Sequence, residues 1–162
     1  MKDSKVEKEF IELIQQNERL IYKVCSCYTS NELPIADLYQ EVVYNLWKGY
    51  PKFRNESSFS TWIYRIALNT CITGIRKKIK SPQYIVALTL GDYLVESEST
   101  EERIHEMYRL IRQLKTLDRA IILLWLEEKP YQEIADIIGL TLSNVAVKLM
   151  RIKDKLKVMS EN

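Results

Sequence analysis

The chain has 162 residues, of which 46% are hydrophobic and 28% charged, and its 24 basic and 22 acidic side chains leave a formal net charge of +2. This length and composition fit one or two small folded domains and exclude a large enzyme scaffold such as an α/β barrel. The four glycines and four prolines are few for a turn-rich β protein or a glycine-rich phosphate-binding fold, whereas the abundant Leu, Ile, Glu and Lys favour helices. The sequence therefore predicts an all-α fold.

The sequence offers little for a membrane anchor, a metal site or an enzyme active site. It has no run of about 18 apolar residues, and its first residues, MKDSKVEKEF, lack the apolar stretch of a signal peptide. Three cysteines without paired spacing fit a reducing cytoplasm. Cys25 and Cys27 would point to different faces of one helix, and His105 is distant in sequence, so we expect buried thiols. We expect no metal, cofactor, small-molecule substrate or catalytic activity.

Two helices are predicted in the N-terminal part of the chain. Apolar residues at spacings of three and four over residues 10–24 predict an amphipathic helix, and Ser30–Pro34 breaks the pattern. The pattern over residues 35–50 is apolar over a wide arc, which indicates a central helix that ends at Pro51. Four of its polar residues lie at helical spacings and share one broad face: Asp37, Gln40, Glu41 and Asn45. Such a face either binds a basic partner or is only solvated.

An aromatic loop and a basic helix end come next. Residues 54–58 lie between Phe53 and Phe59, and Ser58 or Ser60 can cap the third helix. Trp62 belongs to the apolar stripe of that helix, and the sequence leaves open whether it is core or contact. From Trp62 to Lys80 there are five basic residues and no acid. Cations near a helix C-terminus interact favourably with the helix dipole, but five basic residues without an acidic one are more than this effect explains.

Residues 81–100 are predicted to be a linker, because their polarity is mixed and non-periodic apart from a weak strand-like run at residues 84–90. Four helices are predicted after it: from about residue 100 to 114, from 119 to 126 with Asp118 as its cap, from 131 to 138, and from about 141 to 158. On the last of these, five basic residues between 148 and 157 outnumber the single Asp154.

The last two predicted helices have helix-turn-helix spacing. Ala135 is small where two helices must approach closely, and Gly139 supplies the positive φ that the turn needs. Thr141 or Ser143 can cap the second helix, whose outward residues are polar or basic. Base-edge donors near the N-terminus and cations beside phosphates are what a helix in a major groove requires. The pattern favours DNA binding over a packed helical hairpin with a solvated basic face.

Three segments in this order carry a family resemblance. They are Asp37-Leu-Tyr-Gln40-Glu41-Val-Val-Tyr-Asn45-Leu-Trp47; Phe59-Ser-Thr-Trp62-Ile-Tyr-Arg65-Ile-Ala67-Leu-Asn69 followed by Ile75-Arg76-Lys77-Lys78; and Leu114-Lys-Thr-Leu-Asp118-Arg119-Ala120 with the helix-turn-helix after it. Over nearly its whole length the chain resembles a bacterial RNA polymerase sigma factor of the two-domain extracytoplasmic-function group. The family commonly has a basic residue where this chain has Leu68 and Ala146, which leaves the exact promoter sequence open.

The resemblance implies two small helical domains joined by a linker: sigma region 2 at residues 5–80, a linker at 81–100, and sigma region 4 at 101–160. Such a protein makes no bond itself. It binds core RNA polymerase, recognises the −10 and −35 promoter elements and helps to open the duplex, and an anti-sigma protein is an expected further partner. A helix-turn-helix transcriptional regulator without sigma activity is the alternative. It explains the C-terminal half equally well, but not the order of the N-terminal segments.

The resemblance also implies roles for individual residues. Those expected to bind the polymerase are Asp37, Gln40, Glu41 and Asn45. Those expected at the −10 element and in strand opening are Arg54, Asn55, Ser58, Phe59, Trp62, Arg65, Asn69, Arg76, Lys77 and Lys78. Those expected at the −35 element are Gln132, Thr141, Ser143, Asn144, Lys148 and Arg151.

Overall fold

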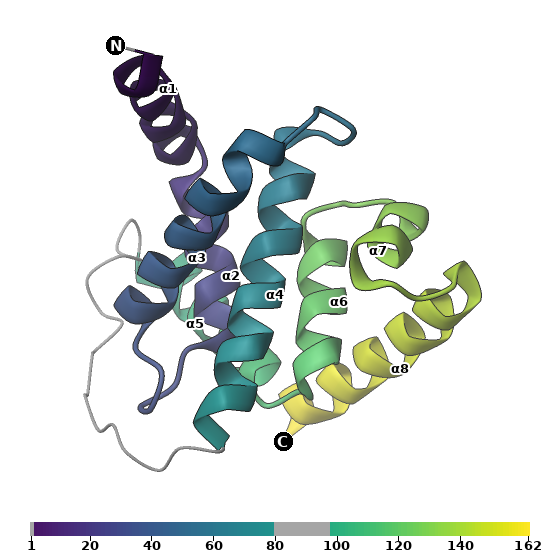
Figure 1. Ribbon diagram of the computed structural model, residues 1–162. Helices are drawn as coiled ribbons and strands as arrows, with labels where there is room; N and C mark the ends of the chain where they lie inside the picture. Colours follow the sequence, from purple (N-terminus) through teal and green to yellow (C-terminus); the bar gives the residue numbers. More distant parts are fainter. Residues whose placement is uncertain (1, 80–97) are drawn as a thin grey trace. The chain divides into compact units, whose positions relative to one another are not determined.

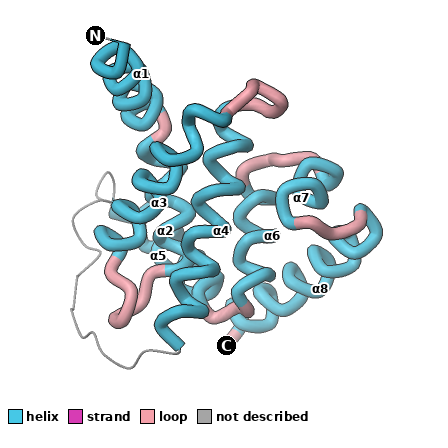
Figure 2. The backbone as a smooth tube through the Cα atoms, viewed as in Figure 1, coloured by secondary structure: helices cyan, strands magenta, loops and turns pink. Residues whose placement is uncertain are grey.

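The computed structural model describes residues 2–79 and 98–162, and every regular element in these two stretches is a helix (Figures 1 and 2). The all-α fold expected from the sequence is confirmed. The chain divides into two compact units, Met1–Leu88 and Thr89–Asn162. The strand-like run at residues 84–90 and most of the predicted linker lie outside the described residues.

The first unit contains the helices α1 (Lys2–Gln16), α2 (Glu18–Tyr28), α3 (Ile35–Gly49) and α4 (Phe59–Ile79), with a short 3-10 turn η1 (Tyr50–Lys52) after α3. Helices α2, α3 and α4 pack against one another (Figure 1). Helix α3 contacts both α2 and α4, but its buried side chains form a narrow stripe of Ile35, Leu38, Val42 and Leu46, so the wide buried arc expected from the sequence is wrong. The core side chains of these three helices include Ile21, Val24, Leu38, Val42, Leu46, Ile63, Tyr64 and Ala67.

The single helix predicted over residues 10–24 is wrong, because the chain breaks at Asn17. Helix α1 ends at Gln16 and α2 begins at Glu18, and Asn17 between them has φ −118° and ψ 16°. The Asn17 Nδ2 donates a hydrogen bond of 2.8 Å to the Leu13 carbonyl. An asparagine side chain that bonds the backbone in this way competes with regular helix hydrogen bonding, so the apolar periodicity continues through a helix break.

Helix α4 begins as the sequence predicts, with Ser58 as its cap. The Ser58 Oγ accepts a hydrogen bond of 3.2 Å from the backbone N–H of Thr61, which satisfies one of the free donors at the helix start. Asn55, in the loop just before, has φ 57°. Asparagine tolerates this left-handed region better than most residues, so the loop turns sharply between η1 and α4.

The second unit contains α5 (Glu98–Arg112), α6 (Thr116–Leu126), α7 (Tyr131–Ile138) and α8 (Leu142–Glu161). Helices α6, α7 and α8 pack mutually, and α5 packs on α6 and α8. The buried run Ala120–Leu124 makes α6 the central helix of this unit. The prediction that Asp118 caps α6 is wrong. The helix begins at Thr116, three residues before the predicted start at 119, and Asp118 lies in its first turn, where a carboxylate interacts favourably with the helix dipole.

The turn between α7 and α8 has the predicted chemistry. Gly139 has φ 81° and ψ 34°, and its N–H donates to the Ala135 carbonyl at 2.8 Å. Thr141 then caps α8, since its Oγ1 accepts a hydrogen bond of 3.2 Å from the N–H of Asn144. Ala135 and Val145 are buried where the two helices meet. Gly139 therefore determines where α7 ends, and the Thr141 cap determines where α8 begins.

The cysteines Cys25, Cys27 and Cys71 are free and buried. The hydrogen bond that the Cys71 thiol donates to the neighbouring Cys25, together with burial, raises the pKa of Cys71 far above its ordinary value, so this thiol stays protonated. Residues 2–79 and 98–162 hold no cluster of His, Cys, Asp and Glu suited to a metal ion. Among the same residues, no helix is long and apolar enough to cross a membrane.

Candidate nucleic-acid interface

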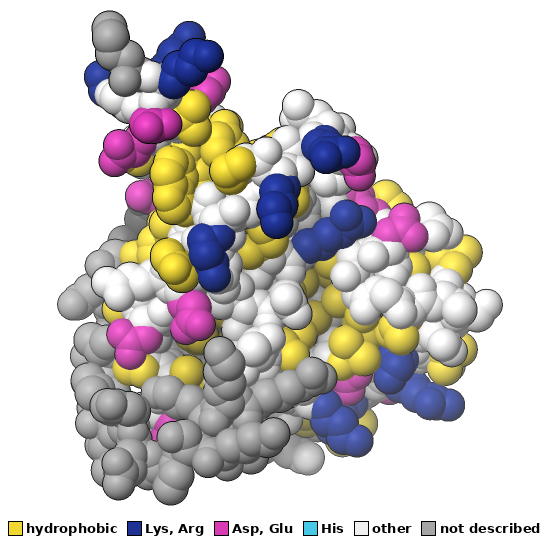
Figure 3. Space-filling view, viewed as in Figure 1, with side chains coloured by type: hydrophobic (Ala, Val, Ile, Leu, Met, Phe, Trp, Pro, Cys, Tyr) yellow, Lys and Arg dark blue, Asp and Glu magenta, His cyan; other side chains and the backbone are white. Residues whose placement is uncertain are grey.

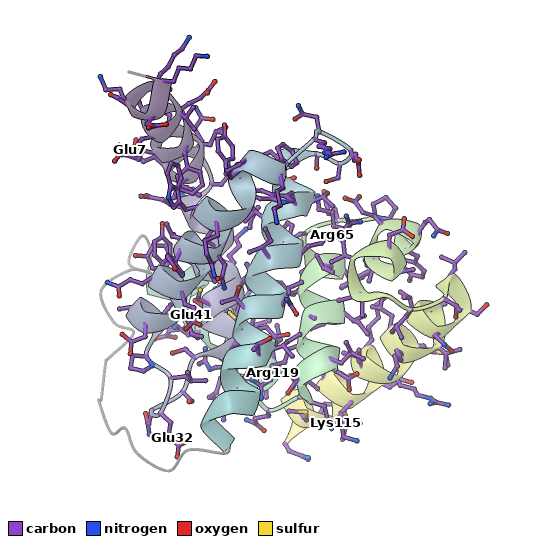
Figure 4. The ribbon with its side chains drawn as sticks, viewed as in Figure 1. Glu7, Glu32, Glu41, Arg65, Lys115 and Arg119 are labelled. Atoms are coloured by element: carbon purple, nitrogen blue, oxygen red, sulfur yellow. The ribbon has the colours of Figure 1, made fainter. Side chains whose placement is uncertain are left out.

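One face of α3 presents polar side chains to solvent. Asp37, Gln40 and Glu41 are all exposed on it, and Figure 4 labels Glu41 on this helix. Asn45, predicted for the same face, is half-buried at its edge, and its Nδ2 donates a hydrogen bond of 3.0 Å to Thr70 Oγ1 on α4. The structure thus brings three of the four predicted residues together, and it gives the fourth a partner inside the unit.

The exposed face of α3 continues into an aromatic patch of Tyr44 and Trp47. The sequence pattern favoured the core over a contact surface for Trp47, and that prediction is wrong. Tyr44 is 58% exposed and Trp47 is 40% exposed. The Lys48 Nζ lies 4.6 Å from the centroid of the Tyr44 ring, and the Trp47 ring packs on Phe10 of α1 at 4.9 Å. Hydrophobic side chains gather where α1 meets α3 in Figure 3. The signal was present, because Trp47 follows Gln40 by seven residues and so lies on the same side of the helix.

An aromatic cluster supports the loop between η1 and α4. The ring centroids of Phe53 and Phe59 are 5.6 Å apart, those of Phe53 and Trp62 are 5.0 Å apart, and those of Phe59 and Trp62 are 5.4 Å apart. All three side chains are half-buried, so each is both packed and partly accessible. Burial, with a smaller contribution from Glu9, raises the pKa of the adjacent Tyr50, which keeps its hydroxyl neutral.

A polar cavity of about 300 Å³ opens beside this cluster. Its lining residues are Lys52, Phe53, Arg54, Glu56, Ser57, Trp62 and Arg65. Three predicted residues, Arg54, Trp62 and Arg65, thus line one cavity, and Figure 4 labels Arg65 on α4. Asn55 and Ser58 are exposed on the loop outside this lining, and Ser58 also caps α4. The cavity combines aromatic faces with cations, the chemistry that holds an unstacked base and its phosphate.

The remaining predicted residues of α4 follow this cavity along the helix. Asn69 is exposed one turn after Arg65. Arg76, Lys77 and Lys78 belong to the last turns of α4, and their side chains lie outside the described residues.

The second unit presents the predicted helix-turn-helix residues. Ser143, Asn144 and Arg151 are exposed on α8. Thr141 is exposed as well, although its hydroxyl is engaged as the cap. Gln132 on α7 is exposed, and its Nε2 donates a hydrogen bond of 3.0 Å to Asp136 Oδ1. Exposed donors at the start of α8 fit contact with base edges.

Four cations surround a second cavity, which lies between the start of α6 and the middle of α8. It measures about 440 Å³ and is lined by Lys115, Leu117, Asp118, Lys148, Arg151, Ile152 and Lys155. Figure 4 labels Lys115 at the start of α6. Of these cations, Lys148 and Arg151 were predicted at the −35 element, Lys155 was noted only as one of five basic residues on the last helix, and Lys115 was missed because it lies outside the helix-turn-helix.

Comparison with known proteins identifies both units. The family model for sigma-70 region 2 matches residues 13–80, and the model for sigma-70 region 4 matches residues 104–156. The RNA polymerase sigma factor YlaC of Bacillus subtilis is 30% identical over 131 residues, covering 75% of this chain and 74% of the relative. The chain belongs to the sigma-70 family, in its extracytoplasmic-function group. As a sigma factor, it directs promoter-specific initiation of transcription by core RNA polymerase.

Two further comparisons extend the likeness over the length of this sigma factor. The extracytoplasmic-function sigma-E factor of Haemophilus influenzae is 26% identical over 167 residues, covering 93% of this chain and 86% of the relative. The solved structure of the sigma factor RpoE of Bartonella quintana, in complex with the anti-sigma factor NepR, matches with a TM-score of 0.75 at 17% identity, covering 95% of this chain and 98% of that chain. The structural likeness supports the sigma-factor fold.

Proposed function

We propose that this sigma factor contacts the transcription machinery through three surfaces, each carried by its own structural element. The exposed face of α3 binds core polymerase, the loop between η1 and α4 holds the −10 element, and the helix-turn-helix of α7 and α8 binds the −35 element. The observation that carries the proposal is that the two units of one chain each present a surface with nucleic-acid chemistry, an aromatic cationic cavity in one and an exposed recognition helix in the other.

The α3 face suits a basic surface of the polymerase. Asp37 and Glu41 offer carboxylate acceptors, and Gln40 offers an amide beside them. Charge-assisted hydrogen bonds to Lys or Arg are stronger than neutral ones, and arrays of them favour one partner and one orientation. Asn45 supports this face from its edge through the hydrogen bond to Thr70, which ties α3 to α4. The aromatic Tyr44 and Trp47 extend the surface toward α1.

The loop cavity suits a base released from the opened duplex. Phe53 and Trp62 offer ring faces for stacking, and Arg54 and Arg65 offer cations to the flanking phosphates. Base stacking on an aromatic ring is worth about 1–3 kcal/mol, enough to offset a large part of the cost of unstacking. Asn55 and Ser58 stand on the exposed rim and are proposed to contact pairing edges of bases or the backbone, as are Phe59, Asn69 and the basic end of α4.

The helix-turn-helix suits duplex DNA. Ser143 and Asn144 lie in the first turn of α8, which reaches base edges when such a helix enters a major groove. Gln132, Thr141, Lys148 and Arg151 are proposed to hold the helix in register, the cations through phosphates.

The same proposal covers partners and place of action. One related solved structure holds the sigma factor RpoE in complex with the anti-sigma factor NepR, and another holds CnrH in complex with the cytosolic domain of CnrY. We propose that an anti-sigma factor regulates this chain. We further propose that the protein acts in the cytoplasm without catalysing a reaction. The proposed domain limits are residues 5–80 for region 2, 81–100 for the linker and 101–160 for region 4.

The decisive experiment changes the distance between the two promoter elements. Core polymerase is combined with this protein on a promoter that it transcribes and on variants with one or about five base pairs inserted between the elements. Five base pairs are roughly half a helical turn and place the elements on opposite sides of the duplex. Transcription should collapse with the half-turn insertion and fall much less with one base pair. A regulator that binds a single site through its C-terminal unit alone would be indifferent to both insertions, and that result would refute the proposal.

A further inference from the structure

Over its first ten residues, the outward face of α8 has an apolar half and a basic half. Successive residues turn by about 100° around a helix, so Leu142, Val147 and Met150 fall within about 140° of each other, together with the exposed Ala146 and Ser143, and the exposed Asp154 follows on the same side one turn after Met150. Leu142 is 48% exposed, Val147 is 42% exposed and Met150 is 60% exposed. Three large apolar side chains so exposed within nine residues form a patch of the kind that marks an interaction site.

The opposite flank of the same helix carries Asn144, Lys148, Arg151 and Lys155. The rotation of α8 is fixed between these two halves, because Val145, Leu149 and Ile152 are buried against the rest of the unit. The apolar half therefore cannot turn inward, and it stands beside a row of cations. Charge complementarity favours a polyanion as the occupant over an apolar protein groove, since a groove that accepted the apolar half would also have to accommodate the cations beside it.

The bases of DNA offer one apolar group to such a helix. Major-groove edges carry hydrogen-bond donors and acceptors, and the exception is the C5-methyl group of thymine. Leu and Val side chains form no hydrogen bonds and the Met sulfur accepts only weakly, so in a major groove these side chains gain most free energy where they cover such methyl groups.

We propose that Leu142, Val147 and Met150 read thymine methyl groups in the −35 element. The inference rests on the proposed function of the helix-turn-helix and deepens it by naming the base chemistry that gives specificity. The cations of the other flank bind phosphates and set the position of the helix without reading sequence.

The spacing of the three side chains limits where the thymines lie. A helix rises about 1.5 Å per residue, so Val147 and Met150 are separated by ~4.5 Å along the axis and Leu142 and Met150 by ~12 Å. Successive base pairs are about 3.4 Å apart. The apolar half thus spans about four base pairs, and its thymines fall within that distance on either strand.

Deoxyuridine tests the proposal, because it removes the methyl group of thymidine and leaves every hydrogen-bonding group in place. Holoenzyme made from core polymerase and the full-length protein is titrated with a promoter fragment that it transcribes, and with fragments that carry deoxyuridine at one −35 thymine at a time. We expect two or more positions at which affinity falls about fourfold, the effect on an equilibrium constant of burying one methyl-sized group. At those positions Val147→Ala and Met150→Ala should abolish the difference between thymine and uracil.

Val158→Ala is the matched control. Val158 is also an exposed apolar residue of α8, at 58%, but it lies ~16 Å beyond Val147 along the helix axis. This variant should keep both the affinity and the sensitivity to deoxyuridine. Unchanged affinity for every uracil-containing fragment would overturn the inference, and so would Val147→Ala or Met150→Ala lowering affinity equally on thymine and uracil.

The same titration separates failure of the inference from failure of the proposed function. Lys148→Ala should reduce the salt dependence of binding by about one unit of slope if α8 lies on DNA. A reduced slope without any effect of deoxyuridine rejects the methyl readout alone. Loss of both effects rejects the placement of α8 on the −35 element. Weaker retention of core polymerase by Met150→Ala, with promoter affinity per holoenzyme unchanged, would assign the apolar half to a protein surface and overturn the inference.

Discussion

Replacement of Gly139 by alanine should destabilise the second unit through the backbone alone. A Cβ atom built at this position meets no atom within 4 Å, so crowding contributes nothing. Gly139 has φ 81°, a left-handed conformation that costs an L-residue about 1–2 kcal/mol. Alanine also restricts the unfolded chain, which offsets roughly 0.4–1 kcal/mol of that cost. The expected net loss in the free energy of unfolding is therefore about 1 kcal/mol, and Gly139→Asn should lose less because asparagine tolerates this conformation.

Gly74→Ala should change the free energy of unfolding in the opposite direction, in the first unit of the same chain. Gly74 lies inside α4, and its added Cβ would lie 3.6 Å from Leu38 Cδ2, an ordinary van der Waals contact. Alanine in a helix interior is favoured over glycine by roughly 0.5–1 kcal/mol, so the first unit should become more stable. Native-state hydrogen exchange, read on peptides from α8 and from α4 of the full-length protein, measures the two units separately. A neutral Gly139→Ala, or a loss at both glycines, would contradict the reasoning.

Three further predictions concern the contact surfaces. The double variant Gln40→Ala with Glu41→Lys should weaken retention of core polymerase in a pull-down without lowering stability, since both side chains are exposed; retention equal to that of the native chain would remove this face of α3 from the interface. Asn45→Ala should instead cost about 0.5–1.5 kcal/mol of stability through the lost hydrogen bond to Thr70, and a double-mutant cycle in urea with Thr70→Val should show coupling, whereas additive effects would mean that the bond contributes nothing. Asn55→Ala should reduce transcription from duplex promoters and from promoters with a pre-melted bubble alike if the loop reads captured bases, and a defect confined to duplex templates would limit the loop to a role in melting.

The helix caps and the turn between α7 and α8 were the features of this fold that the sequence predicted best. Ser58 and Thr141 cap helices as predicted, and Gly139 adopts the predicted positive φ, because each feature depends on a few neighbouring residues. The break at Asn17 was missed for the same kind of reason, since periodicity continues through it while a single side-chain hydrogen bond ends the helix. The start of α6 was misplaced because Asp118 is a good cap residue, whereas the helix begins at Thr116 without a side-chain cap hydrogen bond.

Long-range geometry was the part that the sequence could not supply. The bond from Asn45 to Thr70 joins residues 25 positions apart, and only the packing of α3 on α4 brings them together. The loop cavity likewise requires η1, the loop and α4 to converge, and the exposure of Tyr44 and Trp47 depends on how much of α3 is left uncovered by α1. Residue types suggested the chemistry of these surfaces, while their neighbours determined which side chains remained accessible.

Every cysteine of the chain lies in the first unit, and each is buried. Thiol-directed reagents react with the thiolate, and Cys71 is shielded by packing and held protonated by its raised pKa. Alkylation can therefore proceed only when α2 and α4 separate, and at high reagent concentration its rate equals the opening rate of that unit. The second unit contributes no signal. The rate of cysteine labelling of the unmodified protein thus reports the opening rate of region 2. A ligand that stabilises the closed form of this unit slows the labelling, and one that binds only α7 and α8 leaves it unchanged.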